Sequence, residues 1–174
     1  ARTPLERGFN EQDRGQYKNA GYVFGVTGAC AMYRRTMLED IAEDREYFDE
    51  RFGMFYEDLD LSWRAHNKGW KAYYVPNAVG YHKRGASAHT VTEPPAFLQK
   101  YCFTRLSDEL KARCVRNRYL AIKKNDSVYR FIADLAFIAA YECRLYAYLF
   151  LFSRRALFML LERSCLAGGK IKAP

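Results

Sequence analysis

Hydrophobic and polar positions follow different patterns in the two parts of the chain. Residues 1–20 are polar and show no apolar period, which predicts a loop. Over residues 21–82, short apolar runs alternate with amphipathic segments, and this alternation predicts an α/β fold. From Ala96 onward the pattern is helical and increasingly apolar. The chain is therefore expected to divide into an α/β part, residues 1–95, and a helical tail, residues 96–174.

Turn and capping signals set the expected elements of the first part. The apolar, glycine-rich run at 21–34 predicts a buried strand. A short helix at 36–44 is expected to start with a capping box, because Glu39 follows Thr36 by three positions. The remaining expected elements are an amphipathic helix at 56–68, a strand at 70–75 and an extended run at 78–82.

The helical tail contains a long apolar region at residues 128–163. Its longest uncharged runs, 135–141 and 145–153, are shorter than the roughly 18–20 residues that cross a bilayer. Two interpretations stay open. One is a helical hairpin packed on the body of the protein. The other is an aromatic, arginine-bearing helix that lies at a membrane interface.

The excess positive charge lies entirely in the tail. The 174 residues carry 28 Lys and Arg against 20 Asp and Glu, a net charge of +8. Residues 101–174 contain 14 of these cations and 6 of these carboxylates, and 14 minus 6 accounts for the whole excess. A basic tail predicts an anionic partner, either a membrane surface or a nucleic acid. No nucleic-acid motif accompanies the basic cluster at 111–124, so a nucleic-acid partner is not expected.

The five cysteines argue against two kinds of structural support. Their number is odd and no two form a C-x-x-C pair. A disulfide framework and a zinc site are therefore not expected, and a reducing compartment fits the pattern best.

A cluster of carboxylates marks the start of the helix expected at 56–68. Glu57, Asp58 and Asp60 fall within four positions. A structural interpretation is available, because carboxylates stabilise a helix N-terminus by about 0.3–1 kcal/mol and Asp60 can pair with Arg64 one turn later. A catalytic interpretation is also available, because crowded carboxylates beside the apolar loop before them have raised pKa values, which suits a general base.

A histidine follows the same region. His82 lies at the end of the extended run 78–82, where a neutral imidazole can bind a divalent metal. The alternative is a surface or core histidine without chemistry, which is the interpretation we give to His66 and His89.

Several motifs together resemble one known family. They are V-T-G-A-C-A-M-Y-R-R at 26–35, F-D-E-R-F-G-M-F-Y-E-D-L-D-L-S-W-R at 48–64, and Y-H at 81–82. In this order they resemble the C-terminal half of family 2 glycosyltransferases, in the rhamnosyltransferase-like and galactofuranosyltransferase-like branch. The string R-N-R-Y-L-A-I-K-K-N at 116–125 is similar to the segment that follows the catalytic domain there. The resemblance covers roughly residues 21–125.

The resemblance implies a fold and a chemistry. It implies the C-terminal half of a GT-A (Rossmann-like) domain followed by an α-helical tail. It also implies a nucleotide-sugar donor, a glycan or lipid-linked acceptor, inversion at the sugar carbon, and a divalent metal, Mg or Mn, that neutralises the leaving diphosphate.

The resemblance also assigns roles by position. Asp58 would be the catalytic base and Glu57 its neighbour in the acceptor site. Gly28 and Ala29 would lie under the acceptor and the donor sugar, and His82 would be a metal ligand. The expected structural supports of the helix are Asp60, Trp63 and Arg64.

One part of the family pattern has no match here. The D-x-D metal motif of the family belongs upstream of residue 21, and residues 1–20 contain none. We therefore expect this chain to be a segment of a larger transferase, inactive alone, that works on cell-surface polysaccharide at the cytoplasmic face of the plasma membrane. The alternative is a non-catalytic module that binds glycan, membrane or a partner subunit. The aromatic tail is also a candidate interface for a homo-oligomer.

Overall fold

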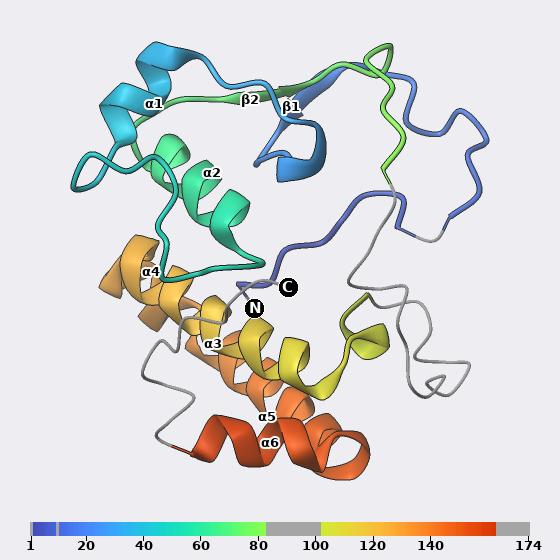
Figure 1. Ribbon diagram of the computed structural model, residues 1–174, viewed down its shortest axis with the longest axis vertical. Coiled ribbons are helices and arrows are strands. Elements are labelled where there is room, and N and C mark those ends of the chain that lie inside the picture. Colours follow the sequence, from blue (N-terminus) through green and yellow to red (C-terminus); the bar gives the residue numbers. More distant parts are fainter. Residues whose placement is uncertain (1, 10, 83–101, 163–174) are drawn as a thin grey trace.

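The computed structural model of the chain describes residues 2–9, 11–82 and 102–162. Figure 1 shows the short strands with helices α1 and α2 in the upper half and helices α3 to α6 in the lower half. The elements are β1 (Gly21–Val23), η1 (Gly28–Cys30), α1 (Arg35–Ile41), α2 (Glu57–Asn67), β2 (Ala72–Tyr74), η3 (Cys102–Arg105), α3 (Asp108–Asn125), α4 (Val128–Ala133), α5 (Leu135–Phe152) and α6 (Arg154–Leu161).

The strands β1 and β2 form an antiparallel pair in which Tyr22 lies opposite Tyr73. Their rings meet edge to face, with centroids 5.2 Å apart. These two strands form the sheet of the described residues and helices dominate the rest, so the α/β prediction is met only in part. The predicted strand at 21–34 was too long. The chain leaves the sheet after Val23 and passes so close to α2 that a Cβ on Gly25 would lie 2.4 Å from Ser62 Oγ.

Helix α1 begins without the predicted capping box. Its N-cap is Arg34, whose side chain makes no capping hydrogen bond, and Thr36 lies inside the first turn. The carboxylate of Glu39 instead accepts a hydrogen bond from Arg35 at 2.7 Å. An exposed ion pair between Arg35 and Glu39 thus replaces the reciprocal cap that the spacing of Thr36 and Glu39 predicted.

Helix α2 confirms the amphipathic helix predicted at 56–68, to within one residue at each end. It packs on α1 through an apolar cluster of buried residues. The members of this cluster are Met37, Ile41, Leu61 and Ala65. The predicted strand at 70–75 corresponds to β2, whereas residues 78–82 form no strand.

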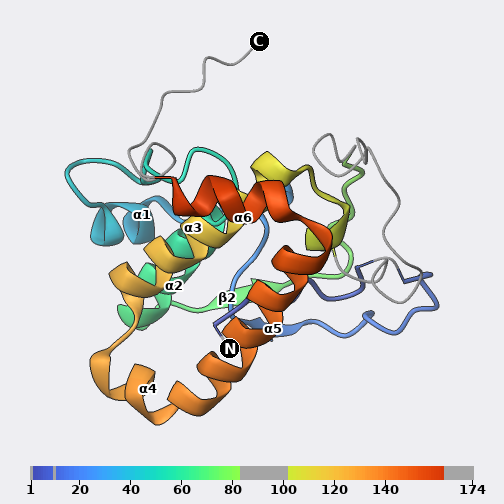
Figure 2. The ribbon, with the colours of Figure 1, turned by 90° about the horizontal axis from the view of Figure 1, so that it is seen from below.

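The apolar region of the tail folds as three helices rather than one. The chain turns at Asp134, between α4 and α5, and at Ser153, between α5 and α6. Figure 2 shows α6 returning beside α3 after the turn at the end of α5. A second apolar cluster joins these helices through Ala112, Val115, Leu145, Leu149 and Ala156. The predicted boundary at residues 95 and 96 lies outside the described residues.

Helix α5 is long and apolar enough, by length and composition alone, to cross a membrane. No other helix of the described ranges meets that criterion. Glu142 and Arg144 are the charged residues within this helix.

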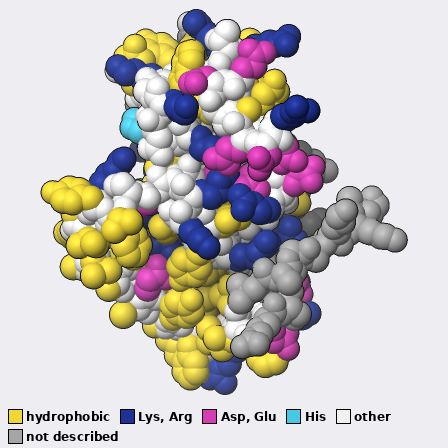
Figure 3. Space-filling view, turned by 90° about the vertical axis from the view of Figure 1, so that its left-hand side faces the viewer, with side chains coloured by type: hydrophobic (Ala, Val, Ile, Leu, Met, Phe, Trp, Pro, Cys, Tyr) yellow, Lys and Arg dark blue, Asp and Glu magenta, His cyan; other side chains and the backbone are white. Residues whose placement is uncertain are grey.

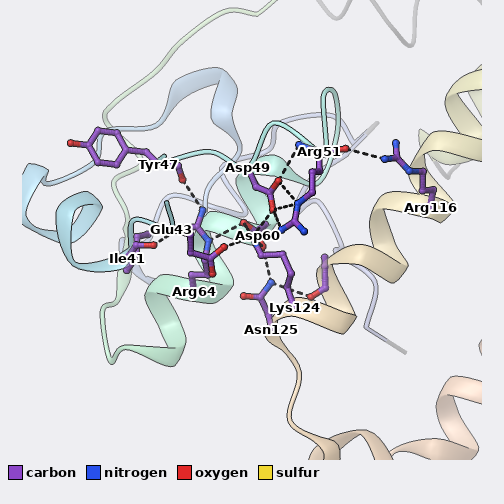
Figure 4. Close-up of polar contacts among 11 residues, drawn as sticks. Ile41, Glu43, Tyr47, Asp49, Arg51, Asp60, Arg64, Arg116, Lys124 and Asn125 are labelled. Atoms are coloured by element: carbon purple, nitrogen blue, oxygen red, sulfur yellow. Dashed lines mark hydrogen bonds and ion pairs between the residues drawn. The ribbon is translucent and has the colours of Figure 1, made fainter. Parts of the chain in front are cut away.

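A buried carboxylate with polar partners connects α2 to α3. The carboxylate of Asp60 has no solvent exposure and accepts hydrogen bonds from Arg64 Nε at 2.9 Å, Lys124 Nζ at 3.1 Å and Asn125 Nδ2 at 2.8 Å (Figure 4). Arg64 also donates to the carbonyl of Ile41 at 2.6 Å. We call Asp60, Arg64, Lys124 and Asn125 the Asp60 hub.

Removing the central carboxylate should destabilise the fold strongly. Asp60→Ala leaves the buried guanidinium of Arg64 without its carboxylate, and breaking a buried pair in this way costs about 3–5 kcal/mol. Lys124 loses one carboxylate partner and keeps Asp49 and Glu43. Urea denaturation measures the loss in free energy of unfolding. The matched control is Glu39→Ala, which breaks an exposed i, i+4 pair and should cost about 0.5 kcal/mol or less. Equal losses in the two variants would contradict the structural role of the hub.

Candidate functional site

Asp58 lies in the first turn of α2, half-exposed, with its carboxylate fixed from two sides. Its Oδ2 accepts a hydrogen bond from the backbone N–H of Gly28 at 3.0 Å, and its Oδ1 accepts one from the N–H of Leu59 at 2.8 Å. Gly28 opens the 3₁₀ turn η1, which also contains Ala29, and both residues are exposed. The structure thus brings Asp58 together with the η1 turn across thirty positions of sequence.

The segment that carries His82 passes the same turn. A Cβ on Gly80 would lie 3.1 Å from the sulfur of Cys30, so the backbone at Gly80 lies directly against η1. His82 follows two residues later and is exposed. The carboxylate of Asp58, the η1 turn and the segment leading to His82 therefore occupy one region of the surface.

Two buried polar atoms lie next to Asp58 without a hydrogen-bond partner among the described residues. They are Tyr33 Oη and Glu57 Oε2. Burial raises the pKa of Tyr33, and the charges of Asp58 and Glu57 raise it further, which places the phenol beside both carboxylates. A buried polar atom without a partner costs about 1–3 kcal/mol.

The backbone that leads into this site is unusual. Phe55 and Tyr56 both have positive φ angles, of 69° and 71°, a region that costs non-glycine residues energy. Asn117, on α3 and without solvent exposure, stabilises this turn. Its Nδ2 donates to the carbonyls of Phe52 at 2.8 Å, Met54 at 2.9 Å and Phe55 at 2.8 Å.

The predicted acidic cluster divides into residues that face different surroundings. Asp58 faces the η1 turn, whereas Asp60 points into the interior of the Asp60 hub. Trp63 is buried with its ring edge-on to Phe24, with centroids 6.3 Å apart. The contacts of Asp60 and Trp63 brace α2.

The described residues do not fit a bound metal by themselves. No group of three His, Cys, Asp or Glu side chains within the described ranges could hold an ion. The metal-ligand role predicted for His82 therefore stays a prediction.

A hollow of about 340 Å³ lies beside the Asp60 hub rather than at Asp58. Its walls are acidic, but several of the carboxylates already have cationic partners. Hydrogen bonds from Arg51 and Lys124 hold the pKa of Asp49 well below its usual range, and Lys124 also pairs with Glu43 at 2.8 Å. We therefore assign this hollow to the support of α2 and not to chemistry.

Sequence reasoning missed Tyr33 and Asn117. Both lie inside strings that carry the family resemblance, at 26–35 and 116–125, so the signal was present without a role attached. The roles depend on contacts over long sequence separations, which periodicity does not reveal.

Glu57 should make stability depend on pH. Burial raises its pKa above the ordinary 4.5, with a smaller contribution from Asp58. The stability that this group contributes is full below pH 4.5 and is lost as the pH rises through the raised value. Glu57→Gln cannot ionise, so it should raise the free energy of unfolding at neutral pH and match the native chain at acid pH. A difference that persists unchanged below pH 4.5, measured by urea denaturation, would contradict this.

Asn117→Ala should loosen the turn before α2. Three carbonyls lose their donor, a change that costs about 1–3 kcal/mol when such groups stay buried. Hydrogen exchange measured by mass spectrometry should be faster at residues 53–59 than in the native chain. The control is Arg116→Ala, on the same helix, which removes one exposed 3.3 Å contact to the Arg51 carbonyl of the same loop. Unchanged exchange in Asn117→Ala would refute the bracing role.

Comparison with known proteins identifies the family. The sequence model of the family described as "Glycosyltransferase like family 2" matches residues 6–107, more than half of the chain. Two curated proteins from two strains of Mycobacterium tuberculosis are 35% identical over 71 residues, or 41% of this chain. Both are named N-acetylglucosaminyl-diphospho-decaprenol L-rhamnosyltransferase.

These relatives are much longer than the matched region. The match spans about a fifth, 21%, of their length. No solved structure matches the chain significantly. The family match includes η1, Asp58 and the segment that reaches His82, so the candidate site lies within the matched region. The chain belongs to the glycosyltransferase-like family 2.

Proposed function

We propose that this chain carries the acceptor-binding and catalytic-base part of a glycosyltransferase of cell-surface polysaccharide synthesis. The enzyme would move a sugar from a nucleotide-sugar donor to a glycan or lipid-linked acceptor. The names of the mycobacterial relatives specify an L-rhamnosyl group and a decaprenol-linked acceptor, and they support the lipid-linked choice. The donor nucleotide would be bound outside the described residues, in the remainder of the intact enzyme.

One observation carries the proposal. Asp58 is held in a single orientation by Gly28 and Leu59, at a half-exposed position beside the unpartnered polar atoms of Tyr33 and Glu57. A general base has to be within hydrogen-bond reach of the proton it removes, and fixed orientation favours that geometry. The phenol of Tyr33 and the carboxyl of Glu57 would bind hydroxyl groups of the same acceptor.

The proposed step is a direct displacement with inversion. The acceptor hydroxyl attacks the anomeric carbon of the donor sugar and forms the new C–O bond. The bond between that carbon and the diphosphate oxygen breaks, and the nucleoside diphosphate leaves with the electron pair. The acceptor proton moves to the carboxylate of Asp58.

Metal binding and location complete the proposal. His82 would supply one ligand to a divalent cation, Mg or Mn, that neutralises the leaving diphosphate, with further ligands from outside the described residues. No role of Asp58, Tyr33 or Glu57 depends on that ion. The enzyme would work at the cytoplasmic face of the plasma membrane, where the basic tail meets anionic lipid.

Asp58→Asn in the intact enzyme should abolish most sugar transfer. Loss of a general base lowers kcat by about 10²–10⁴-fold, whereas the half-exposed position and the similar shape of asparagine predict little change in unfolding free energy. The assay follows a labelled sugar from a panel of nucleotide sugars to N-acetylglucosaminyl-diphospho-polyprenol. The control is Asp44→Asn, an exposed carboxylate at φ 48°, where asparagine fits equally well. Undiminished kcat in Asp58→Asn would remove the base assignment and favour a binding module.

A further inference from the structure

The bend between helices α4 and α5 exposes large apolar side chains. Five of them have exposed fractions between 51% and 83%. They are Val128, Tyr129, Ile132, Leu135 and Phe137, and we call this group the apolar elbow. Figure 3 shows hydrophobic side chains gathered over the lower half of the molecule on that face. Patches of this kind on a folded protein mark binding surfaces.

The apolar surface continues along the outward side of α5. Among the exposed residues of this helix, Arg144 is the one that carries a charge. The others beyond the elbow are Ala136, Ala139, Ala140, Cys143, Tyr146, Ala147, Phe150, Leu151 and Phe152. A helix whose outward side faces water normally carries polar residues there, so this surface requires an apolar partner.

Contacts with α3 argue that α5 lies on the body and does not cross a bilayer. Glu142, near the middle of α5, pairs with Arg118 and accepts a hydrogen bond from Tyr119 at 2.6 Å. At the end of α5, Lys111 donates to Ser153 at 2.9 Å. Helix α3 carries six Lys and Arg residues and could not enter hydrocarbon with its partner.

The charges around this surface favour anionic lipid. Lys123, Arg130 and Arg144 are exposed, and none of them has a carboxylate partner within the described ranges. The nearby carboxylates are already paired, since Asp126 and Asp134 bind Arg2. Each Lys or Arg near an anionic membrane surface adds about 1 kcal/mol of binding.

We propose that the apolar elbow and the outward side of α5 bind the surface of an anionic lipid bilayer, with α5 lying flat in the headgroup region. Aromatic and aliphatic side chains enter the boundary of the acyl chains, and the flanking cations meet lipid phosphates. This membrane contact deepens the proposed function. It rests on that function in one respect only, because a lipid-linked acceptor is the reason why the enzyme needs a membrane.

Vesicle flotation tests the proposal with the whole 174-residue chain. The vesicles contain equal parts of phosphatidylglycerol and phosphatidylcholine, and parallel samples contain phosphatidylcholine alone. The chain should float with the anionic vesicles. Ile132→Ser with Phe137→Ser should lower the partition coefficient by about tenfold or more, because two buried apolar contacts are lost. The control, Met32→Ser with Val79→Ser, removes apolar residues elsewhere that are at least as exposed, and it should float like the native chain.

Two further measurements test the contribution of the cations and the orientation of α5. Arg130→Gln and Arg144→Gln should each lower binding to anionic vesicles about fivefold, with little effect on the neutral ones. Alkaline carbonate should release the bound chain, as expected for a helix on the surface. Resistance to carbonate would overturn the flat orientation and show that α5 crosses the bilayer.

Other outcomes would overturn the proposal as a whole. One such outcome is that the native chain floats with neither the anionic nor the neutral vesicles. The other is that the elbow variant floats as well as the control variant. If the elbow substitutions instead convert a dimer to a monomer in light scattering, the surface binds a second copy of the chain. Flotation needs neither donor nor turnover, so its failure leaves the assignment of Asp58 intact, and loss of that assignment leaves the membrane surface intact.

Discussion

The buried carboxylate of Asp60 connects parts of the molecule that apolar packing leaves separate. One apolar cluster joins α1 to α2, and another joins α3 to α5 and α6. Between them the contact of α2 with α3 is polar, and Asp60 binds Arg64 from its own helix together with Lys124 and Asn125 from α3. Such a contact requires one geometry, because misplacement leaves charges buried without partners. The orientation of α2 therefore depends on this carboxylate.

The candidate site follows from that orientation. With α2 fixed, Asp58 in its first turn reaches the N–H of Gly28, and Asn117 holds the strained turn that precedes the helix. Two energetic costs fall together at the start of α2. They are the positive φ of Tyr56 and the carboxyl oxygen of Glu57 that has no hydrogen-bond partner among the described residues. Strain and unsatisfied polar atoms gather at sites that bind ligands, where the ligand offsets them.

Sequence patterns predicted α2 and β2 well, because apolar periodicity is a local signal. They failed where distant contacts decide the outcome. The strand from Gly21 ends early because Gly25 packs against α2, and Glu39 pairs with Arg35 instead of capping α1. The chemistry of Asp58 was suggested by the family resemblance. The role of Asn117 could be recognised only from the folded structure, because this residue lies more than sixty positions from the carbonyls that it binds.

The claim that the start of α2 binds the acceptor can be tested most directly by chemical-shift mapping. The isotopically labelled chain would be titrated with N-acetylglucosaminyl diphosphate, the soluble part of the acceptor named in the relatives. The account predicts that the largest amide shifts fall at Gly28, Tyr33, Glu57 and Asp58. Shifts confined to the acidic hollow at residues 43–51, or none at saturating ligand, would contradict it.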